Sequence, residues 1–271
     1  MSFDIQSPQF SESLPKTSHT APSINKDLFE LAFTHANFST TIEEKIGALV
    51  IPHHLLAGRL IAETLVQAGT NNPITIVLIS PDHFFAGKAR MSTSLEDWET
   101  PYGRIKANHE LILELTRTPP LHVDEKPFER EHGIYNLLPF IKKTFPNAFI
   151  VPIIIKSFVG DSMAEDLAKI LSKHLPNDAL IIASLDFSHE VTRERAVEQD
   201  AISQEILERR ERERISEIAV DCQACILTLM SYTEKRQFTD FRLIENTNSA
   251  DVLRQPKQPD VTSYIIGYFT K

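Results

Sequence analysis

The sequence predicts an α/β protein in which a mixed, largely parallel central sheet is covered by helices on both faces. Two observations predict this architecture. Short apolar runs with the length and β-branching of buried strands alternate with longer segments whose apolar residues recur at helical spacing. The short runs are also apolar at successive positions, which indicates strands that are covered on both faces.

The predicted elements follow one another from about residue 26 onward. The predicted strands cover residues 47–52, 74–80, 149–155, 179–184, 240–245 and 263–269. The predicted helices cover residues 55–67, 108–117, 134–144, 162–174, 193–208 and 222–232. Asp161 and Asp221 stand where the N-cap residues of the fourth and sixth helices are expected.

Composition indicates one folded domain. The chain has 271 residues, of which 42% are hydrophobic and 24% charged, which is ordinary globular usage with ample material for a core. Residues 1–25 are rich in Ser, Pro and Thr and lack periodicity, so we expect a flexible N-terminal arm there. Residues 26–271 are expected to form a single domain.

Charge and hydropathy exclude several classes of partner. The net charge is −9, and no window has the clustered Lys and Arg residues that neutralise a phosphate backbone, so nucleic acid is not expected as a partner. No run of about 18 apolar residues exists, so no membrane span is expected. The first residues have neither the basic nor the apolar region of a secretory signal, and we expect a cytoplasmic protein.

Polar side chains follow three of the predicted strands. His53 and His54 come directly after the first, Asp82 and His83 after the second, and Asp186 after the fourth, with His189 three residues later. In open α/β sheets, ligands bind beyond the carboxyl ends of the strands. Since successive strand residues face opposite ways, only one of His53 and His54 can point into such a crevice.

A fourth polar segment, Glu131 and His132, lies at the amino end of a predicted helix. A neutral imidazole is the commonest metal ligand, and two imidazoles with one carboxylate are typical of non-haem iron sites. Taken singly, each strand-end histidine is more often a hydrogen-bonded structural residue than a ligand. The convergence of several such segments favours a metal site.

The residues around 221 allow more than one interpretation. On residue chemistry alone, Asp221 is interpreted as a helix N-cap. Cys222 and Cys225 form a C-x-x-C pair that could be redox-active or half of a metal site, but no second pair accompanies it. A buried, unreactive Cys225 on a helix is the favoured interpretation.

The order of the motifs resembles the Memo family, also known as AmmeMemoRadiSam system protein B, which is similar in fold to the class III extradiol ring-cleaving dioxygenases. The motifs that carry the resemblance are Pro52-His53, Ser80-Pro81-Asp82-His83, Thr100-Pro101-Tyr102-Gly103, Glu131-His132, Ser184-Leu185-Asp186-Phe187-Ser188-His189 and Thr262-Ser263-Tyr264. Each motif alone is weak, whereas six in the right order are a specific signal.

The resemblance implies a set of site residues. It implies His53, His83 and Asp221 as metal ligands, with Cys222 as the alternative third ligand if the alignment is shifted by one residue. A set of two histidines and one carboxylate suits iron(II), with copper or zinc as alternatives.

The resemblance further implies that Asp186, His189 and His132 serve as catalytic residues that orient a ligand or transfer protons. The chain departs from the family at Tyr135 and Leu137, where the family pattern has a Glu and a second His. This departure puts in doubt any substrate chemistry assumed for the family.

Three functions are compatible with these features. The leading hypothesis is a metal-dependent, oxidoreductase-like protein acting on a small molecule. The second is a non-catalytic metal-binding or partner-binding protein of the same fold, whose partners are the AMMECR-type and radical-SAM proteins of the same system. A zinc hydrolase is the third, and no motif such as HExxH supports it.

Overall fold

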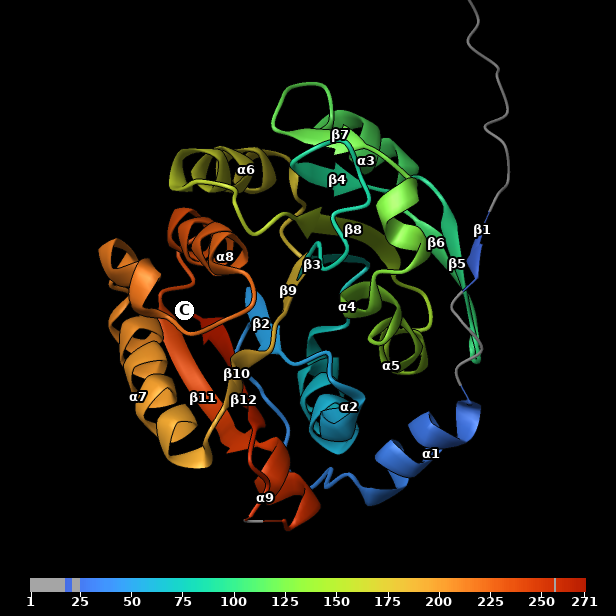
Figure 1. Cartoon of the computed structure of the whole chain (residues 1–271). Helices are drawn as coiled ribbons and strands as arrows, with labels where there is room; N and C mark the ends of the chain where they lie inside the picture. The colour runs from blue at the N-terminus through green and yellow to red at the C-terminus, as the bar shows by residue number, and fades with distance from the viewer. Residues whose placement is uncertain (1–17, 21–24, 256) are drawn as a thin grey trace, which may run out of the picture.

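In a computed structural model of the protein, which describes residues 18–20, 25–255 and 257–271, five neighbouring strands of the central sheet run parallel (Figure 1). In sheet order they are β6 (Gly103–Ala107), β8 (Phe149–Ile155), β3 (Thr75–Pro81), β9 (Leu180–Ser184) and β2 (Ala48–Ile51). Their parallel direction brings the carboxyl ends of β3, β9 and β2 to one edge of the sheet.

Both flanks of the parallel strands are mixed. On one side, β12 (Val261–Thr270) runs antiparallel to β2 and also pairs with β10 (Phe187–Val191) and β11 (Asp240–Asn248). The other flank consists of β5 (Asp97–Thr100), which is antiparallel to β6, and β1 (Ser18–Thr20), β4 (Met91–Thr93) and β7 (Leu121–Val123). The predicted mixed, largely parallel sheet is confirmed.

The central strands divide their side chains between two cores. In β3, Ile76 and Leu78 belong to one hydrophobic core, and Val77 and Ile79 belong to the other. Successive strand residues point to opposite faces, so continuous apolar runs are what a sheet buried on both sides requires.

Helices cover both faces of the sheet (Figure 1). Those contributing to the first core are α1 (Lys26–His35), α2 (Gly58–Gln67), α4 (His132–Tyr135) and α5 (Leu138–Thr144). Those contributing to the second are α3 (His109–Leu115), α6 (Asp161–His174), α7 (Arg193–Arg209) and α8 (Gln223–Lys235). A short α9 (Ser249–Leu253) precedes β12.

The predicted helix at 134–144 is in fact two helices, α4 and α5. Pro139 stands in the first turn of α5, where its missing N–H leaves no hydrogen bond unmade, whereas inside a continuous helix it would break one. Short strands such as β4 and β7 were not predicted because they have three residues each and no continuous apolar run.

Both predicted N-caps are wrong. Gly160 is the N-cap of α6 and Asp161 is its first residue. Cys222 is the N-cap of α8, and Asp221 lies outside the helix.

The predicted arm, residues 1–25, lies mostly outside the described residues. Its described part includes β1, whose three residues pair in parallel with β5. Within the described part of the chain, no helix combines the length and the apolar character needed to cross a bilayer.

Candidate metal site

Three neighbouring strands deliver the predicted site residues to one place. His53 follows β2, His83 follows β3, and Asp186 follows β9, which lies between the other two in the sheet. The topological expectation that these strand ends share one edge is therefore met.

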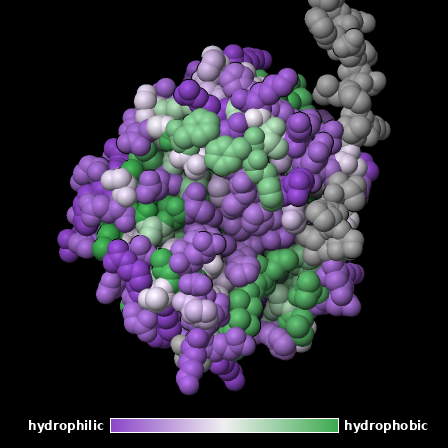
Figure 2. All heavy atoms as spheres, in the orientation of Figure 1, coloured by the Kyte–Doolittle hydropathy of each residue, from purple (hydrophilic) through white to green (hydrophobic). Residues whose placement is uncertain are grey.

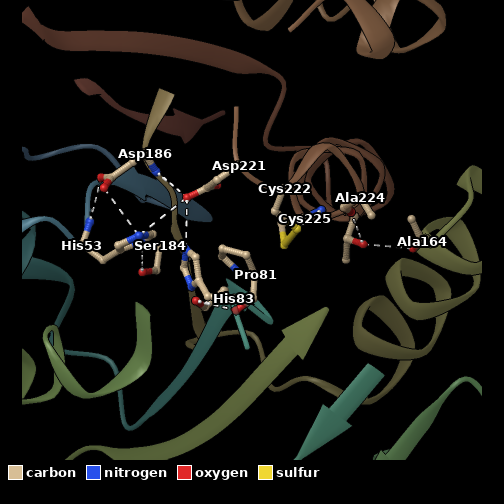
Figure 3. The surroundings of a disulfide bond; sticks show 12 residues. His53, Pro81, His83, Ala164, Ser184, Asp186, Asp221, Cys222, Ala224 and Cys225 are labelled. Carbon is tan, nitrogen blue, oxygen red and sulfur yellow. Dashed lines mark hydrogen bonds and ion pairs between the residues drawn. A yellow bond between two sulfur atoms is a disulfide. The ribbon is translucent and has the colours of Figure 1, made fainter. Parts of the chain in front are cut away.

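His53 is held with one ring nitrogen free. Its Nδ1 lies 3.2 Å from Ser184 Oγ, and Ser184 donates its own hydroxyl proton to the Gly133 carbonyl at 2.6 Å. Ser184 Oγ must therefore accept a hydrogen bond from His53 Nδ1–H. Nε2 is left with a lone pair, 3.4 Å from Asp186 Oδ2 and 3.6 Å from Asp221 Oδ2 (Figure 3). Burial lowers the pKa of His53, which favours this neutral form.

His83 is held in the same tautomer by Glu131. Its Nδ1 donates to Glu131 Oε1 at 2.6 Å, and its backbone N–H donates to Oε2 of the same carboxylate at 2.9 Å. Glu131 is completely buried and, as N-cap of α4, also accepts a hydrogen bond from the Gly133 N–H. His83 Nε2 then lies 4.0 Å from Asp221 Oδ2. A carboxylate that accepts a hydrogen bond from the ring nitrogen that does not bind the metal is the arrangement that orients metal-binding histidines.

The Asp221 carboxylate faces both histidines. Asp186 and Asp221 hold each other through reciprocal hydrogen bonds: Asp186 N–H donates to Asp221 Oδ2 at 3.0 Å, and Asp221 N–H donates to the Asp186 carbonyl at 3.1 Å. Burial, and next the charge of Asp186, raise the pKa of Asp221 well above its usual value.

The donor set fits a divalent cation. Asp221 Oδ1 is buried and has no hydrogen-bond partner among the described residues. The other oxygen of this carboxylate, Oδ2, faces the Nε2 atoms of His53 and His83, and Asp186 Oδ2 also faces His53 Nε2. Electron-rich atoms this close repel one another unless a proton or a cation lies among them.

His132 completes a cluster of three histidines. Its ring centroid is 4.1 Å from that of His83 and 5.1 Å from that of His53. Each of the three offers a ring nitrogen within 4.8 Å of the other two, so His132 is an alternative or additional candidate ligand. Burial and then the neighbouring His83 and His53 lower the pKa of His132 to about 4, so that it is neutral at pH 7.

The other predicted catalytic residues lie in different surroundings. Asp186 lines the site and accepts a hydrogen bond from the His53 backbone N–H at 3.2 Å. His189 is exposed on β10, and within the described ranges it makes no hydrogen bond or ion pair with the three histidines. Its role in proton transfer stays a prediction.

Cys222 and Cys225 form a disulfide next to the site (Figure 3). Cys225 is buried on α8, as the favoured interpretation expected, and the structure adds that its sulfur is bonded to that of Cys222. The Cys222 sulfur is bonded to Cys225, and the Asp221 carboxylate faces His53 and His83.

Sequence reasoning did not identify the residues that orient the two histidines. In the sequence, Glu131 stands out only as the neighbour of His132, and Ser184 only as the first residue of the motif at 184–189. The usable signal was the place of Glu131 before an apolar helix, since an N-cap carboxylate has a second oxygen free for another partner. Gly133 also passed unnoticed, although a Cβ there would lie 1.9 Å from Ser80 Oγ.

Aromatic side chains follow the site on the surface. Phe84 and Phe85, directly after His83, are each nearly half exposed, and the Arg130 guanidinium lies 5.2 Å from the centre of the Phe84 ring. Figure 2 shows a mainly hydrophilic face that is interrupted by separate hydrophobic patches.

A separate cavity of about 790 Å³, lined by Thr75, Lys106 and Phe149 among others, lies toward the amino ends of β3 and β8.

Fold and site together define an α/β protein with a cluster of candidate metal ligands at the carboxyl edge of a mixed sheet. The model of the Memo-like protein family matches residues 22–266, and the chain belongs to this family.

Relatives include a MEMO1 family protein of Aquifex aeolicus (strain VF5), 30% identical over 191 residues that cover 69% of this chain and 71% of the relative. A MEMO1 family protein of Caldivirga maquilingensis is 26% identical over 217 residues, which cover 75% of this chain and 77% of that one.

A solved structure supports the fold alone. An uncharacterized protein of Escherichia coli K12, JW3007, superposes with a TM-score of 0.53 at 12% identity, covering 83% of this chain and 100% of the other. The architecture is thus Memo-like, consistent with the extradiol dioxygenase-like α/β class expected from the sequence.

Proposed function

We propose that this protein is a metal-dependent oxidoreductase whose pocket takes a small molecule, and that His53, His83 and Asp221 hold an iron(II) ion. One observation carries the proposal. Both imidazoles donate Nδ1–H to a neighbouring oxygen and direct an unprotonated Nε2 toward the same carboxylate oxygen. Two nitrogens and one carboxylate on one side of an ion are the donor set of non-haem iron sites.

When bound, such an ion supplies open coordination positions and Lewis acidity toward a small molecule. The protein's own residues have separate tasks. Ser184 and Glu131 fix the tautomers of the two histidines. His132, neutral at pH 7 and in ring contact with His83, is the imidazole beside the ligands that can accept a proton. Asp186 holds the backbone of His53 and of Asp221 in place.

The first experiment measures metal content. Protein purified anaerobically should contain close to one equivalent more iron than the His53→Ala and His83→Ala variants. His54→Ala is the matched control, because His54 is adjacent, exposed and bonded to Tyr264 Oη instead of the site. Unchanged metal content in both site variants would refute the ligand assignment.

The second experiment tests catalysis. Iron-loaded protein is screened for oxygen consumption with small molecules, including catechol-like compounds, and His132→Gln should lower any turnover while iron content is kept. Turnover that is equal in His132→Gln and wild type would remove His132 from the mechanism.

A second function, metal binding without turnover, is favoured by one observation. Leu137, where the family pattern has a histidine, is completely buried in the core, and Tyr135 replaces a carboxylate. The pocket therefore has fewer polar groups than the family pattern offers. Full iron occupancy with no oxygen consumption would support this function, in which the site serves a partner such as the AMMECR-type or radical-SAM proteins.

A further inference from the structure

A second group of metal-ligating side chains lies on the flank of the sheet and shares no residue with the three-histidine site. It consists of His19 on β1, Glu96 before β5, and Glu125 before the 3-10 helix Lys126–Glu129. Each offers one ligand atom, and these atoms all lie within 4.8 Å of one another.

One ring nitrogen faces three oxygens in this group. His19 Nε2 is 3.0 Å from Glu125 Oε2, 3.1 Å from Ser94 Oγ and 3.6 Å from Glu96 Oε2. Ser94 donates its hydroxyl proton to Glu125 Oε2. A single imidazole proton can serve only one of the three acceptors well.

The spacing suits a first-row metal ion. Zinc–nitrogen and zinc–oxygen bonds of about 2.0 to 2.2 Å place neighbouring tetrahedral ligand atoms about 3.3 to 3.6 Å apart. Of the distances from His19 Nε2 to the two carboxylates, the one to Glu96, 3.6 Å, lies within that range and the one to Glu125, 3.0 Å, lies slightly below it.

The ligand atoms are also held in position before any ion arrives. His19 is 7% exposed, and its ring lies 4.4 Å from that of Trp98. Glu125 accepts a hydrogen bond from the Leu95 N–H through Oε1, which leaves Oε2 directed at His19. Glu96 makes a further interaction of its own. Preformed donors lose little freedom when they bind an ion.

We propose that His19, Glu96 and Glu125 form a second metal site, which takes a divalent transition-metal ion such as zinc(II). An ion there links three segments that are distant in sequence: the edge strand β1, the start of β5, and the loop that leads from Glu125 to Glu131. The ion fastens β1 to the body of the protein and stiffens the loop that ends at the carboxylate orienting His83.

Zinc binding is measured in a variant whose histidine site is disabled, His53→Ala/His83→Ala, by equilibrium dialysis with zinc(II) alone. The expected result is one equivalent of bound zinc. Adding His19→Gln should weaken this binding at least tenfold, and Glu96→Gln should weaken it less. His35→Gln is the matched control, since His35 is an exposed histidine at the end of α1.

An optical readout does not depend on the double variant. Trp98 is the only tryptophan of the chain and its ring is in contact with that of His19, so cobalt(II) bound to His19 should quench its fluorescence at stoichiometric concentrations. Quenching should be lost in His19→Gln and kept in His53→Ala. The proposal is overturned if the disabled variant holds no zinc, or if His19→Gln changes neither its zinc binding nor the quenching in the otherwise wild-type chain.

Discussion

At the scale of single residues, the tautomer of each histidine decides what the site can do. Ser184 and Glu131 are not candidate ligands themselves. Each accepts a hydrogen bond from the Nδ1–H of one histidine. A histidine protonated on Nε2 would present no lone pair from that nitrogen, and a histidine free to rotate would not hold its lone pair toward the ion. These two acceptors are therefore as necessary for metal binding as the ligands they orient.

Glu131→Gln tests this dependence. The amide would place an N–H₂ group against either the His83 N–H or its Nδ1–H, and each of these needs an acceptor. Metal affinity should fall about 10- to 100-fold. The measurement is a competition titration with a chelator of known affinity. The control is Glu129→Gln, two residues earlier and exposed. Wild-type affinity in Glu131→Gln would show that His83 needs no such partner.

Asp200 gives a pH-dependent prediction away from the ligands. It is buried and accepts hydrogen bonds from Ser188 and Ser263, yet desolvation raises its pKa above the usual 3.8. The folded carboxyl therefore holds its proton to a higher pH than the unfolded one does. Its contribution to stability is present at low pH and is lost as pH rises from about 3.8 through the folded pKa.

Asp200→Asn keeps an oxygen for both serine hydroxyls and cannot ionise. Relative to wild type, the variant should become more stable as pH rises from 3.5 to 7, measured as free energy of unfolding in urea at each pH. A difference that does not vary with pH would mean that Asp200 titrates alike in the folded and unfolded chains.

At the scale of elements, the short helix α4 is positioned by a close approach. Its residue Gly133 packs on Ser80 at the end of β3, while its carbonyl accepts the Ser184 hydroxyl proton from the end of β9. Glu131 and His132 are in this way fixed relative to β3 and β9, two of the three strands that carry the site. The helix has four residues, so its position depends on these contacts more than on helix propensity.

Gly133→Ala should be strongly destabilising. The added Cβ would lie 1.9 Å from Ser80 Oγ and 3.1 Å from Ser80 Cβ, so the Ser80 hydroxyl must rotate away and α4 or β3 must give by a few tenths of an ångström. We expect a loss of about 1–3 kcal/mol in the free energy of unfolding, together with weaker metal binding.

Gly69→Ala is the control for this substitution, because its new Cβ would meet only Thr144 at an ordinary 4.0 Å. The control should be neutral or slightly stabilising, since alanine restricts the unfolded chain. Equal stability of the two variants would contradict the close packing described for Gly133.

The sequence predicted the strands that are apolar at successive positions and missed shorter or mixed elements, including α1, β5 and β6, each of which buries only one or two apolar side chains. All six predicted strands are present, because periodicity and apolar runs report burial directly. The short strands β1, β4 and β7 have three residues each and depend on pairing with distant segments, which no local pattern records. Cys222 was likewise not predicted as the N-cap of α8. Its sulfur is held there by the disulfide to Cys225, and this bond is a property of the folded chain that the local sequence does not record.

At the scale of the whole molecule, the site joins segments from most of the chain. His53, His83, Glu131, Asp186 and Asp221 come from five loops that only the completed sheet brings together. Strand order made the convergence of His53, His83 and Asp186 predictable. The place of Asp221 depends on the isolated bridge between Phe187 and Val220, and sequence alone had favoured a capping role for it.

A site of this kind makes metal binding and global stability interdependent. An ion that binds only the folded protein stabilises it by about 2.7 kcal/mol when its free concentration is 100 times Kd. Removing the metal with a chelator should therefore lower Tm by several degrees in His19→Gln, where the histidine site alone responds. The same treatment of His19→Gln/His53→Ala should change Tm little. Equal shifts in both proteins would place the stabilising ion elsewhere.

The division of β2, β3 and β9 between two cores restricts how this protein can change in length. Removing or inserting one residue within such a strand would exchange the side chains of the two cores and turn the site residue that follows it, His53, His83 or Asp186, to the opposite face. Substitutions of similar size leave that alternation intact. We therefore expect the three strands to keep a constant number of residues among relatives. Changes in chain length should be confined to the loops at the amino-terminal edge of these strands, which lies opposite the site residues.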